Sequence, residues 1–571
     1  MNEVANGIGE RAASVLGPES DLLEDLDAAG LGQAATAALR AVALHPAVPA
    51  RAGLRLCGDL ARIPVVAISR FVGAHVEPPV TPDPADRRFG DPAWDTNPAF
   101  FSIRQTYLAL CRYARTVVGS TPLAADTRGK ATLALNLLLD AAAPTNLPVT
   151  NPAVLKRAFD TAGGSLARGA GHFLDDLVHN DGRPRQVDAS GFEVGVNLAA
   201  TPGRVVYRNE LMELIQYEPQ TPEVRAVPLL FSPPWINKYY VMDLAPGRSF
   251  VEWAVRHGRT VFAISYRNPT REMAGTTMDD YLVDGPQRAL DVVQEITGSE
   301  TTDIVGLCLG GALTAITAAY LNQAGDHRVG ALTLLNTMLD YSEPGALGAF
   351  TDRRSIERLE RKMHKEGGFE GKSMAGTFDV LRANDLIFNY VVSSWLLGQD
   401  PPKFDILAWN ADSTRMPSAM HGFYLRNFYL ENKLALGSLE IAGTVLDLSA
   451  IKTPAYVVSA VNDHIVPWES AYKTVGLLSG PIRFVLGNGG HIAGIVSPPS
   501  PKAWYLVGPE DTEMPSTGRA WRESAARRGG SWWEDWAAWS GANSGPLAPP
   551  PPMGSDTHPA LEPAPGRYVR T

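Results

Sequence analysis

Short apolar runs recur along the chain from residue 227 onward, and each lies between turn-forming residues. They fall at residues 227–231, 260–264, 304–307, 331–335, 455–458 and 482–486. Such runs are typical of strands that are covered on both faces, as in a parallel sheet. Stretches with helical spacing, such as residues 312–322, lie between the runs. The pattern therefore predicts an α/β fold built on a mostly parallel sheet.

The first 190 residues follow a different pattern. They are rich in Ala and Leu at helical spacing, as in Leu39-x-x-Val42-x-Leu44, and a Pro-rich break divides them at residues 77–84. We therefore predict a mostly helical N-terminal region over residues 1–190 and an α/β region over residues 191–571.

Two segments of the α/β region depart from the alternation of strands and helices. Residues 343–445 carry few strand signals and many helical or aromatic ones. They lie between two predicted strands, and we predict that they form an inserted lid. A Pro-rich tail segment follows at residues 541–556.

Composition narrows the class of protein. Hydrophobic residues make up 45% and charged residues 20% of the 571 positions, which is typical of a soluble globular protein. The formal net charge of −10 disfavours nucleic-acid binding. The 3 cysteines, Cys57, Cys111 and Cys308, are too few and too scattered for a disulfide framework or a zinc site, so we expect a reducing compartment and no metal. We find neither a signal peptide nor an apolar run of roughly 18 residues, so we expect a cytoplasmic protein without a transmembrane segment.

The most informative motif lies where one apolar run ends and a helical stretch begins. Val305-Gly306-Leu307-Cys308-Leu309-Gly310-Gly311 has the Gly-x-Cys-x-Gly form of an elbow, which presents a nucleophile on a sharp strand-to-helix turn. Asp463 and His491 follow later in the chain. The order nucleophile, acid, histidine is that of the α/β-hydrolase fold. A thiol at the nucleophile position points to acyl transfer through a thioester.

Each of these three residues has an expected role. The thiolate is the reactive form of cysteine, and a helix N-terminus directly after Cys308 would favour negative charge there. His491 would remove the thiol proton, while Asp463 would orient the imidazole or help to deprotonate an attacking hydroxyl.

An oxyanion hole should lie beside the nucleophile. The backbone N–H of Leu309, the residue after the nucleophile, is the expected first donor. A second donor should come from residues 232–238, which follow the first strand, and we assign it to the backbone N–H of Ile236. Trp235 in the same segment is expected to support the site.

Each candidate also has a structural interpretation. A lone cysteine is more often a small buried hydrophobe, and a lone aspartate or histidine is more often structural; only their combination favours catalysis. His464 competes with His491 for the base role, but we expect it to make a local hydrogen bond. Cys57 and Cys111 lie in helical apolar contexts and are expected to be core thiols. The tryptophans of residues 532–539 fall at helical spacing, so we expect them to dock a helix onto the domain.

As a whole, the sequence resembles the poly(3-hydroxyalkanoate) synthases, bacterial polyester polymerases of the α/β-hydrolase superfamily. The resemblance runs from about Asp86 to Val569. Besides the elbow, it rests on the following motifs: Asp91-Pro92-Ala93-Trp94, Pro233-Pro234-Trp235-Ile236-Asn237-Lys238-Tyr239-Tyr240, Tyr266-Arg267-Asn268-Pro269, Asn384-Asp385-Leu386-Ile387-Phe388-Asn389-Tyr390, Trp409-Asn410-Ala411-Asp412-Ser413-Thr414, Asp463-His464-Ile465-Val466-Pro467-Trp468, Gly490-His491-Ile492-Ala493-Gly494 and Ala564-Pro565-Gly566-Arg567-Tyr568-Val569.

The resemblance implies an activity. Cys308 would take the acyl group from a (R)-3-hydroxyacyl-CoA and release CoA, and the 3-hydroxyl of another unit would attack to lengthen the polyester. His491 would act as base, and Asp463 would support it or activate the hydroxyl. No cofactor is implied. The overall resemblance to the single-subunit short-chain class implies monomers such as 3-hydroxybutyryl-CoA.

The resemblance also implies partners. The chain would form a homodimer without a different partner subunit and would work at the surface of cytoplasmic polyester granules, alongside granule proteins. The N-terminal region would serve dimerisation, activation or granule association, and the lid would open for substrate.

Two other functions fit parts of the sequence. A cysteine-nucleophile α/β-hydrolase, either a thioesterase or a polyester depolymerase, would use the same three residues and release free acid. A non-catalytic granule-surface protein would keep the fold alone, but it would have no need of Cys308, Asp463 and His491 together.

Overall fold

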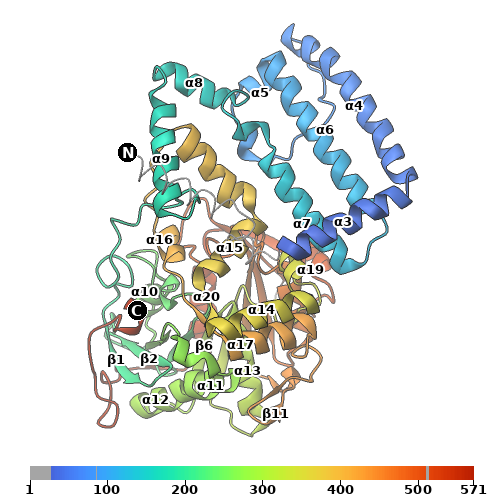
Figure 1. Ribbon diagram of the computed structural model, residues 1–571. Coiled ribbons are helices and arrows are strands. Elements are labelled where there is room, and N and C mark those ends of the chain that lie inside the picture. Colours follow the sequence, from blue (N-terminus) through green and yellow to red (C-terminus); the bar gives the residue numbers. More distant parts are fainter. Residues whose placement is uncertain (1–27, 85, 510–512) are drawn as a thin grey trace. The chain divides into compact units, whose positions relative to one another are not determined.

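The computed structural model describes residues 28–84, 86–509 and 513–571, which form two compact units (Figure 1). The first unit comprises Met1–Asp188 and Ala375–Pro402, and the second comprises Ala189–Met374 and Lys403–Thr571. Residues 1–27 of the predicted helical region lie outside the described residues. The domain boundaries at residue 190 and the lid at residues 343–445 stay predictions.

The second unit is built on a ten-stranded sheet with the strand order β1-β2-β5-β4-β6-β7-β12-β13-β14-β15. Its strands from β5 to β13 are parallel to one another, whereas β1, β2, β14 and β15 pair antiparallel. The bounds are β1 Gly203–Arg208, β2 Met212–Tyr217, β4 Leu229–Ser232, β5 Val261–Tyr266, β6 Thr302–Leu307, β7 Val329–Leu335, β12 Ala455–Ala460, β13 Ile482–Gly487, β14 Trp504–Val507 and β15 Ala526–Gly529.

The six parallel strands are those that the apolar runs predict, so the predicted α/β-hydrolase fold with a mostly parallel sheet is confirmed. Strand β6 lies between β4 and β7, with Ile304 opposite Leu230 and Leu332, and all six of its residues are buried. This burial on both faces explains why the run at 304–307 is apolar without alternation. The antiparallel strands at the two edges were not predicted.

Helices cover both faces of this sheet (Figure 1). Helix α13 packs its buried residues with Leu332 and Leu334 of β7 in the main core. Thr333 points to the other face, because successive strand side chains alternate, and it accepts a hydrogen bond from Trp536 of α20 at 2.9 Å. The helices of this unit are α10 Phe250–Arg256, α11 Met278–Leu282, α12 Arg288–Thr297, α13 Leu309–Gln323, α14 Arg353–Glu366, α16 Asp405–Ala411, α17 Ser418–Tyr424, α18 Trp468–Tyr472, α19 Gly518–Ser524 and α20 Trp532–Asn543.

Shorter elements complete the second unit. π-Helical turns follow α11 at Val283–Gln287 and α17 at Leu425–Leu430. The two-residue strands pair antiparallel as β3 Val224–Arg225 with β16 Leu547–Ala548, β8 Gly368–Phe369 with β9 Met416–Pro417, and β10 Glu440–Ile441 with β11 Thr444–Val445.

The first unit is helical, as the sequence predicts for this part of the chain. Its helices are α3 Ala28–Leu44, α4 Ala47–Phe71, α5 Ala93–Thr96, α6 Pro98–Ser120, α7 Ala125–Ala141, α8 Pro152–Asp160, α9 Gly164–His179 and the part of α15 (Gly371–Leu381) from Ala375 onward. π-Helical turns follow at Asn384–Phe388 and Val391–Leu396. Trp395 in the second of these turns donates a hydrogen bond to Asp176 of α9 at 2.8 Å.

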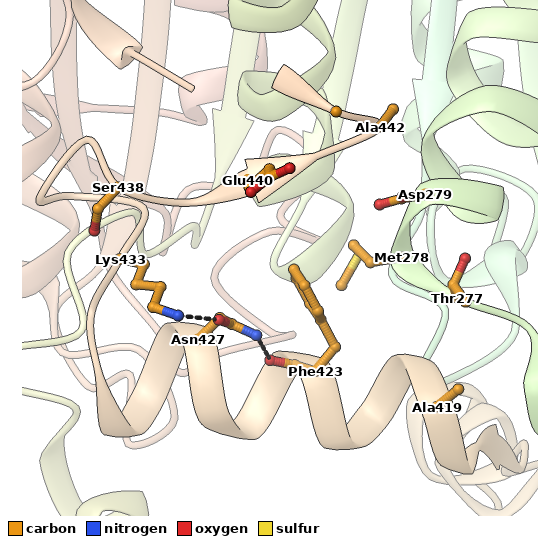
Figure 2. A pocket seen from close by; sticks show the side chains of 11 residues that line it. Thr277, Met278, Asp279, Ala419, Phe423, Asn427, Lys433, Ser438, Glu440 and Ala442 are labelled. Atoms are coloured by element: carbon orange, nitrogen blue, oxygen red, sulfur yellow. Dashed lines mark hydrogen bonds between the residues drawn. The ribbon is translucent and has the colours of Figure 1, made fainter. Parts of the chain in front are cut away.

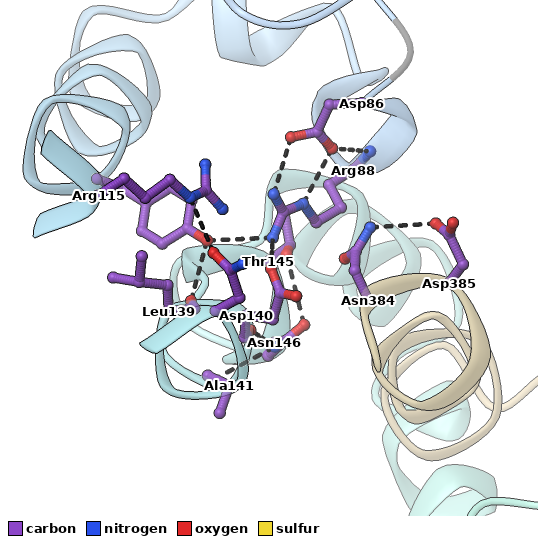
Figure 3. Close-up of polar contacts among 12 residues, drawn as sticks. Asp86, Arg88, Arg115, Leu139, Asp140, Ala141, Thr145, Asn146, Asn384 and Asp385 are labelled. Atoms are coloured by element: carbon purple, nitrogen blue, oxygen red, sulfur yellow. Dashed lines mark hydrogen bonds and ion pairs between the residues drawn. The ribbon is translucent and has the colours of Figure 1, made fainter. Parts of the chain in front are cut away.

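A partly buried arginine connects the segments of the first unit (Figure 3). Arg88 forms ion pairs with Asp86 at 2.9 Å and with Asp140 of α7 at 3.1 Å. It also donates a hydrogen bond to the hydroxyl of Tyr107 in α6 at 3.1 Å. Because the Arg88 side chain is 16% exposed, these contacts replace water that the guanidinium loses on folding.

Cysteine placement in the first unit differs from the prediction for one residue. Cys111 is buried, as expected, but Cys57 is exposed, so its prediction as a core thiol is wrong. Helix α4 buries Asp59, Ile63, Val66 and Ala67. Cys57 lies two residues before Asp59, which places it on the opposite side of the helix.

No helix among the described residues is long and apolar enough to cross a membrane.

Candidate active site

Cys308 lies at the turn between β6 and α13, and its backbone has φ 51° and ψ −116°. A positive φ in a residue other than glycine costs about 1–3 kcal/mol and persists only where the surrounding structure holds it. The Cys308 N–H donates to the carbonyl of Leu335 in β7 at 2.8 Å, and its carbonyl accepts from the N–H of Gly311 at 3.0 Å. These bonds hold the thiol at the carboxyl end of the parallel strands, directly before a helix.

The glycines of the elbow permit two close approaches of backbone. A Cβ on Gly306 would lie 2.5 Å from the Cα of Gly311, so the strand could not turn tightly into the helix. A Cβ on Gly310 would lie 2.5 Å from the main chain of Pro233. The segment after β4 therefore lies directly against the elbow, and any side chain at residue 310 would push it away.

Asp463 and His491 meet at the ends of β12 and β13. The Nδ1 atom of His491 lies 2.7 Å from Oδ2 of Asp463. The other carboxylate oxygen of Asp463 accepts the N–H groups of Ile465 and Val466, both at 2.9 Å. The Asp463 side chain is fully buried, so it is fixed in position and faces the imidazole rather than solvent.

The proton affinity of His491 is shifted strongly. Burial lowers the pKa of His491, but the negative charges of Asp463 and of a Cys308 thiolate, together with hydrogen bonds to both, outweigh burial and raise the pKa to about 10. Asp463, His491 and Cys308 therefore interact as one chain of groups. The imidazolium form is favoured in this setting, which is what an imidazole needs in order to take the proton of a neighbouring thiol.

The loop that carries His491 is held by contacts that the sequence analysis did not assign. Asn336, at the end of β7 with φ 43°, donates its side-chain amide to the His491 carbonyl. Trp532 of α20 donates its indole N–H to the carbonyl of Gly494 at 2.9 Å, and Trp533 donates to that of Ile495 at 2.9 Å. The prediction that these tryptophans dock a helix is confirmed, and the docked helix fixes the histidine loop. Asn336 gave no signal in the sequence, because its role depends on strands that pair at long range.

The predicted oxyanion donors belong to the two segments that meet at Gly310. Leu309 is the first residue of α13, where backbone N–H groups have no partner within the helix. Trp235 and Ile236 follow Pro233, whose main chain lies against Gly310. Trp235 is 2% exposed and packs on Tyr281 and Tyr424, with ring centroids at 5.6 and 6.2 Å. His464 lies beside Asp463 after β12 and is partly exposed, and its role stays a prediction.

Two buried tyrosines, Tyr341 and Tyr424, and the partly buried Tyr429 lie close to Cys308. Their ring centroids are 4.9 to 6.1 Å apart. Burial, then the neighbouring tyrosines and Cys308, raise the pKa of Tyr341 and Tyr424 well above the usual value. Tyr424 and Phe428 lie within the predicted lid at residues 343–445, and both are buried against Tyr341.

A separate groove lies alongside α17 and the π-helical turn at Leu425–Leu430 (Figure 2). Its volume is about 440 Å³, and Phe423, another residue of the predicted lid, points into it. None of the three candidate catalytic residues lines it; the lining residues are Thr277, Met278, Asp279, Ala419, Phe423, Asn427, Lys433, Ser438, Glu440, Ala442 and Gly443. Lys433 is engaged by Asn427 at 2.9 Å and by Glu431 at 2.9 Å, so its charge is already paired.

The described part of the chain shows no set of metal ligands. Across residues 28–84, 86–509 and 513–571, no group of three or more histidine, cysteine, aspartate or glutamate side chains is arranged to hold a metal ion.

Comparison with known proteins places the chain in one family. Residues 85–254 match the family described as poly-beta-hydroxybutyrate polymerase (PhaC) N-terminus, and residues 241–498 match the alpha/beta hydrolase fold. Poly(3-hydroxyalkanoate) polymerase 2 of Ectopseudomonas oleovorans is 42% identical over 92% of both chains. The poly(3-hydroxyalkanoate) polymerase of Methylorubrum extorquens is 41% identical over 88% of this chain and 84% of its own. The poly(3-hydroxyalkanoate) polymerase subunit PhaC of Cupriavidus necator is 39% identical over 85% of this chain and 83% of its own. The chain therefore belongs to the poly(3-hydroxyalkanoate) polymerase family, and it is an acyltransferase.

Proposed function

We propose that this chain polymerises (R)-3-hydroxyacyl-CoA into poly(3-hydroxyalkanoate) through a thioester on Cys308. The observation that carries the proposal is the thiol of Cys308 on a strained elbow, close enough to His491 to raise the pKa of an imidazole that a buried carboxylate orients. A thiol exchanges acyl groups with a CoA thioester at little cost in free energy, because one thioester replaces another. The same site can therefore load and unload acyl groups without a cofactor.

The first half of the reaction transfers the acyl group to the enzyme. The Cys308 thiol gives its proton to His491, and the thiolate attacks the carbonyl carbon of the CoA thioester. The carbonyl oxygen becomes an oxyanion that the N–H groups of Leu309 and Ile236 stabilise. When the carbon–sulfur bond to CoA breaks, His491 returns the proton to the CoA sulfur, and a thioester remains on Cys308.

The second half lengthens the polymer. The 3-hydroxyl of another hydroxyacyl unit gives its proton to His491 and attacks the Cys308 thioester. The ester bond forms as the carbon–sulfur bond breaks, and His491 returns the proton to Cys308. Because the Asp463 side chain is fully buried and both of its oxygens accept hydrogen bonds, we assign it to support of His491 rather than to direct activation of the hydroxyl.

We propose short-chain monomers such as 3-hydroxybutyryl-CoA. Three tyrosine side chains fill space close to Cys308, which favours a small acyl group. Replacing the CoA ester of 3-hydroxybutyrate with that of 3-hydroxyoctanoate should lower the rate of CoA release at least tenfold. Equal rates for the two thioesters would contradict the assignment.

The helical unit supports a role at the surface of cytoplasmic polyester granules. Helix α4 and the residue that directly follows it expose an apolar stripe in which Val65, Ile68 and Val72 are 65%, 63% and 75% exposed. A contiguous apolar stripe on a surface helix favours contact with an apolar partner, and the polyester product is such a surface. Changing these three residues to serine should release the protein from isolated granules into the supernatant, and unchanged granule binding would refute this role. Homodimerisation stays a prediction.

The activity is tested by incubating the purified protein with (R)-3-hydroxybutyryl-CoA and following CoA release and turbidity together, alongside Cys308→Ala. We expect CoA release with insoluble polymer, and the loss of both in the variant. CoA release without polymer would establish a thioesterase instead. Granule binding by a protein without any CoA release would favour the non-catalytic alternative.

A further inference from the structure

The second oxyanion donor lies on an irregular segment, and an unusual buried lysine lies at the end of that segment. Lys238 is 9% exposed and follows Ile236 by two residues. Its Nζ atom donates to the main-chain carbonyl of Val569 at 2.7 Å and forms an ion pair with Asp412 at 3.0 Å. Burial of an ammonium group costs a large free energy of desolvation, which its hydrogen bonds and ion pair must offset.

The segment that carries Asp412 also binds the main chain around Lys238. The carbonyl of Lys238 accepts the indole N–H of Trp409 at 2.8 Å, and the hydroxyl of Thr414 donates to the carbonyl of Trp235 at 3.3 Å. Asp412, which lies between these two residues in sequence, also accepts the hydroxyl of Tyr240 at 2.9 Å. The residues on both sides of Ile236 are thus held from one neighbouring segment, residues 409–414.

The segment that ends in Val569 is itself anchored to the edge of the sheet. Leu561 donates its N–H to the carbonyl of Val205 in β1 at 2.7 Å, and the N–H of Tyr568 binds the buried carboxylate of Glu213 in β2 at 3.0 Å. The Val569 carbonyl, which accepts the hydrogen bond from Lys238, therefore has a fixed position. We call residues 561–569 the C-terminal strap.

The opposite end of the oxyanion segment touches the nucleophile elbow. A Cβ on Gly310 would lie only 2.5 Å from the main chain of Pro233. Residues 233–238 are therefore fixed at one end by the elbow and at the other by Lys238. The backbone N–H of Ile236 lies between these two anchors.

We propose that Lys238 is a positioning residue that holds the backbone N–H of Ile236 in the oxyanion hole, by fastening residues 235–238 to Asp412 and to the C-terminal strap. This inference rests on the proposed thioester mechanism. It gives a common purpose to three motifs that the triad leaves unexplained, those at residues 233–240, 409–414 and 564–569. Displacement of an oxyanion donor weakens stabilisation of the tetrahedral intermediate and leaves the thiolate unaffected.

Two reactions of Cys308 separate positioning from general damage. Acylation by (R)-3-hydroxybutyryl-CoA passes through an oxyanion, whereas alkylation by iodoacetamide is a displacement at carbon that forms none. Both need the Cys308 thiolate and its access to solvent. Peptide mapping distinguishes Cys308 from Cys57, and the exposed Cys57 gives an internal reference rate in the same sample.

Lys238→Met keeps the length of the side chain and removes its charge and donors. We expect the rate of acylation to fall about 10- to 100-fold, with KM changed less than kcat, while the rate of Cys308 alkylation stays within twofold of wild type. Asp412→Asn should also lower the acylation rate without lowering the alkylation rate, but by a smaller factor. Lys473→Met is the matched control, because Lys473 is also ion-paired, to Glu343 at 3.0 Å, and donates a hydrogen bond to Ser342 rather than to residues 233–238.

Parallel loss of acylation and alkylation in both variants, or no loss of either, would overturn the inference. If Lys238→Met fails to fold, as judged by its thermal transition, Asp412→Asn decides on the same two rates. A wild-type protein that is not acylated at Cys308 would instead overturn the proposed function, and the two failures are therefore distinguishable.

Discussion

Asp463→Asn tests how much the buried carboxylate contributes to the site. The substitution is isosteric and keeps an oxygen that can accept the N–H groups of Ile465 and Val466, which lie 2.9 Å from Oδ1. It places an amide NH₂ group, instead of a carboxylate oxygen, 2.7 Å from Nδ1 of His491. The imidazole must then accept at Nδ1 and carry its proton on the other nitrogen, which disables it as a base for the thiol.

The magnitude follows from the pKa of His491. The interval between the ordinary pKa of 6.5 and the value of about 10 in the folded protein corresponds to about 5 kcal/mol. Among the interactions that raise the pKa, the charge of Asp463 comes first and that of Cys308 second. Assigning about half of the total to Asp463 gives 2–3 kcal/mol, so we expect a loss on the order of 10²-fold in the acylation rate, and up to about 10⁴-fold with the tautomer change.

The same pKa predicts a pH dependence of stability. Because folding raises the pKa, the contribution to stability is fully present below pH 6.5 and is lost as the pH rises through about 10. The free energy of unfolding of the wild type should therefore exceed that of Asp463→Asn most at neutral and lower pH, and the difference should shrink toward pH 10.

The assay measures the rate of CoA release from (R)-3-hydroxybutyryl-CoA together with the pKa of His491 by NMR titration of labelled histidine. Asp447→Asn is the control, because Asp447 also accepts a backbone N–H, that of Ser449 at 2.9 Å, but is exposed and far from the elbow in sequence. An Asp463→Asn enzyme within threefold of wild type, or one whose His491 keeps its raised pKa, would refute the reasoning.

Three further substitutions test the supports of the site and of the helical unit. Gly310→Ala should cost about 1–3 kcal/mol and lower the acylation rate at least tenfold, because the new methyl group meets the main chain of Pro233; denaturant unfolding and CoA release measure both effects. Trp532→Phe leaves the buried Gly494 carbonyl without its donor and should cost about 1–3 kcal/mol, with a loss of a few-fold in kcat, by the same two measurements. Arg88→Ala leaves two carboxylates without their cation and should destabilise the helical unit by about 3–5 kcal/mol, measured as a shift in its denaturant midpoint, with little change in the chemistry of Cys308.

Each of these substitutions has a control in the same chain. Gly119→Ala adds a methyl group where nothing lies within 4 Å, so it should be neutral or stabilising. Trp539→Phe changes a tryptophan of the same helix α20, and Arg519→Ala removes an ion-paired arginine that is 90% exposed. If a control variant loses as much stability or activity as the variant it is paired with, the contact named for that variant does not explain the loss.

The sequence predicts the centre of the catalytic unit well, because the physics there is local. A parallel strand buried on both faces must be apolar, so the six runs mark β4 to β13. The elbow must have small residues at 306, 310 and 311, so it is visible as a motif. The antiparallel edge strands could not be predicted in this way, because an edge strand need not be buried on both faces. Strand β15, for example, is exposed at all four of its residues and carries no apolar run.

Residues whose roles depend on long-range contacts could not be predicted. Asn336 holds the His491 carbonyl only because β7 and the histidine loop meet in space. The placement of Tyr341 beside Tyr424 and Cys308 likewise depends on the packing of α17 against the segment that follows β7. Cys57 shows the converse error, since an apolar context in sequence did not reveal which face of α4 is covered.

The central claim is a covalent thioester on Cys308, and mass spectrometry of the quenched enzyme tests it most directly. The protein is mixed with (R)-3-hydroxybutyryl-CoA, stopped with acid and digested, and the acylated peptide is identified. We expect a hydroxybutyryl group on the peptide that carries Cys308, and its absence in Cys308→Ala together with the loss of CoA release. Continued CoA release by Cys308→Ala, or an acyl group on any other residue, would contradict it.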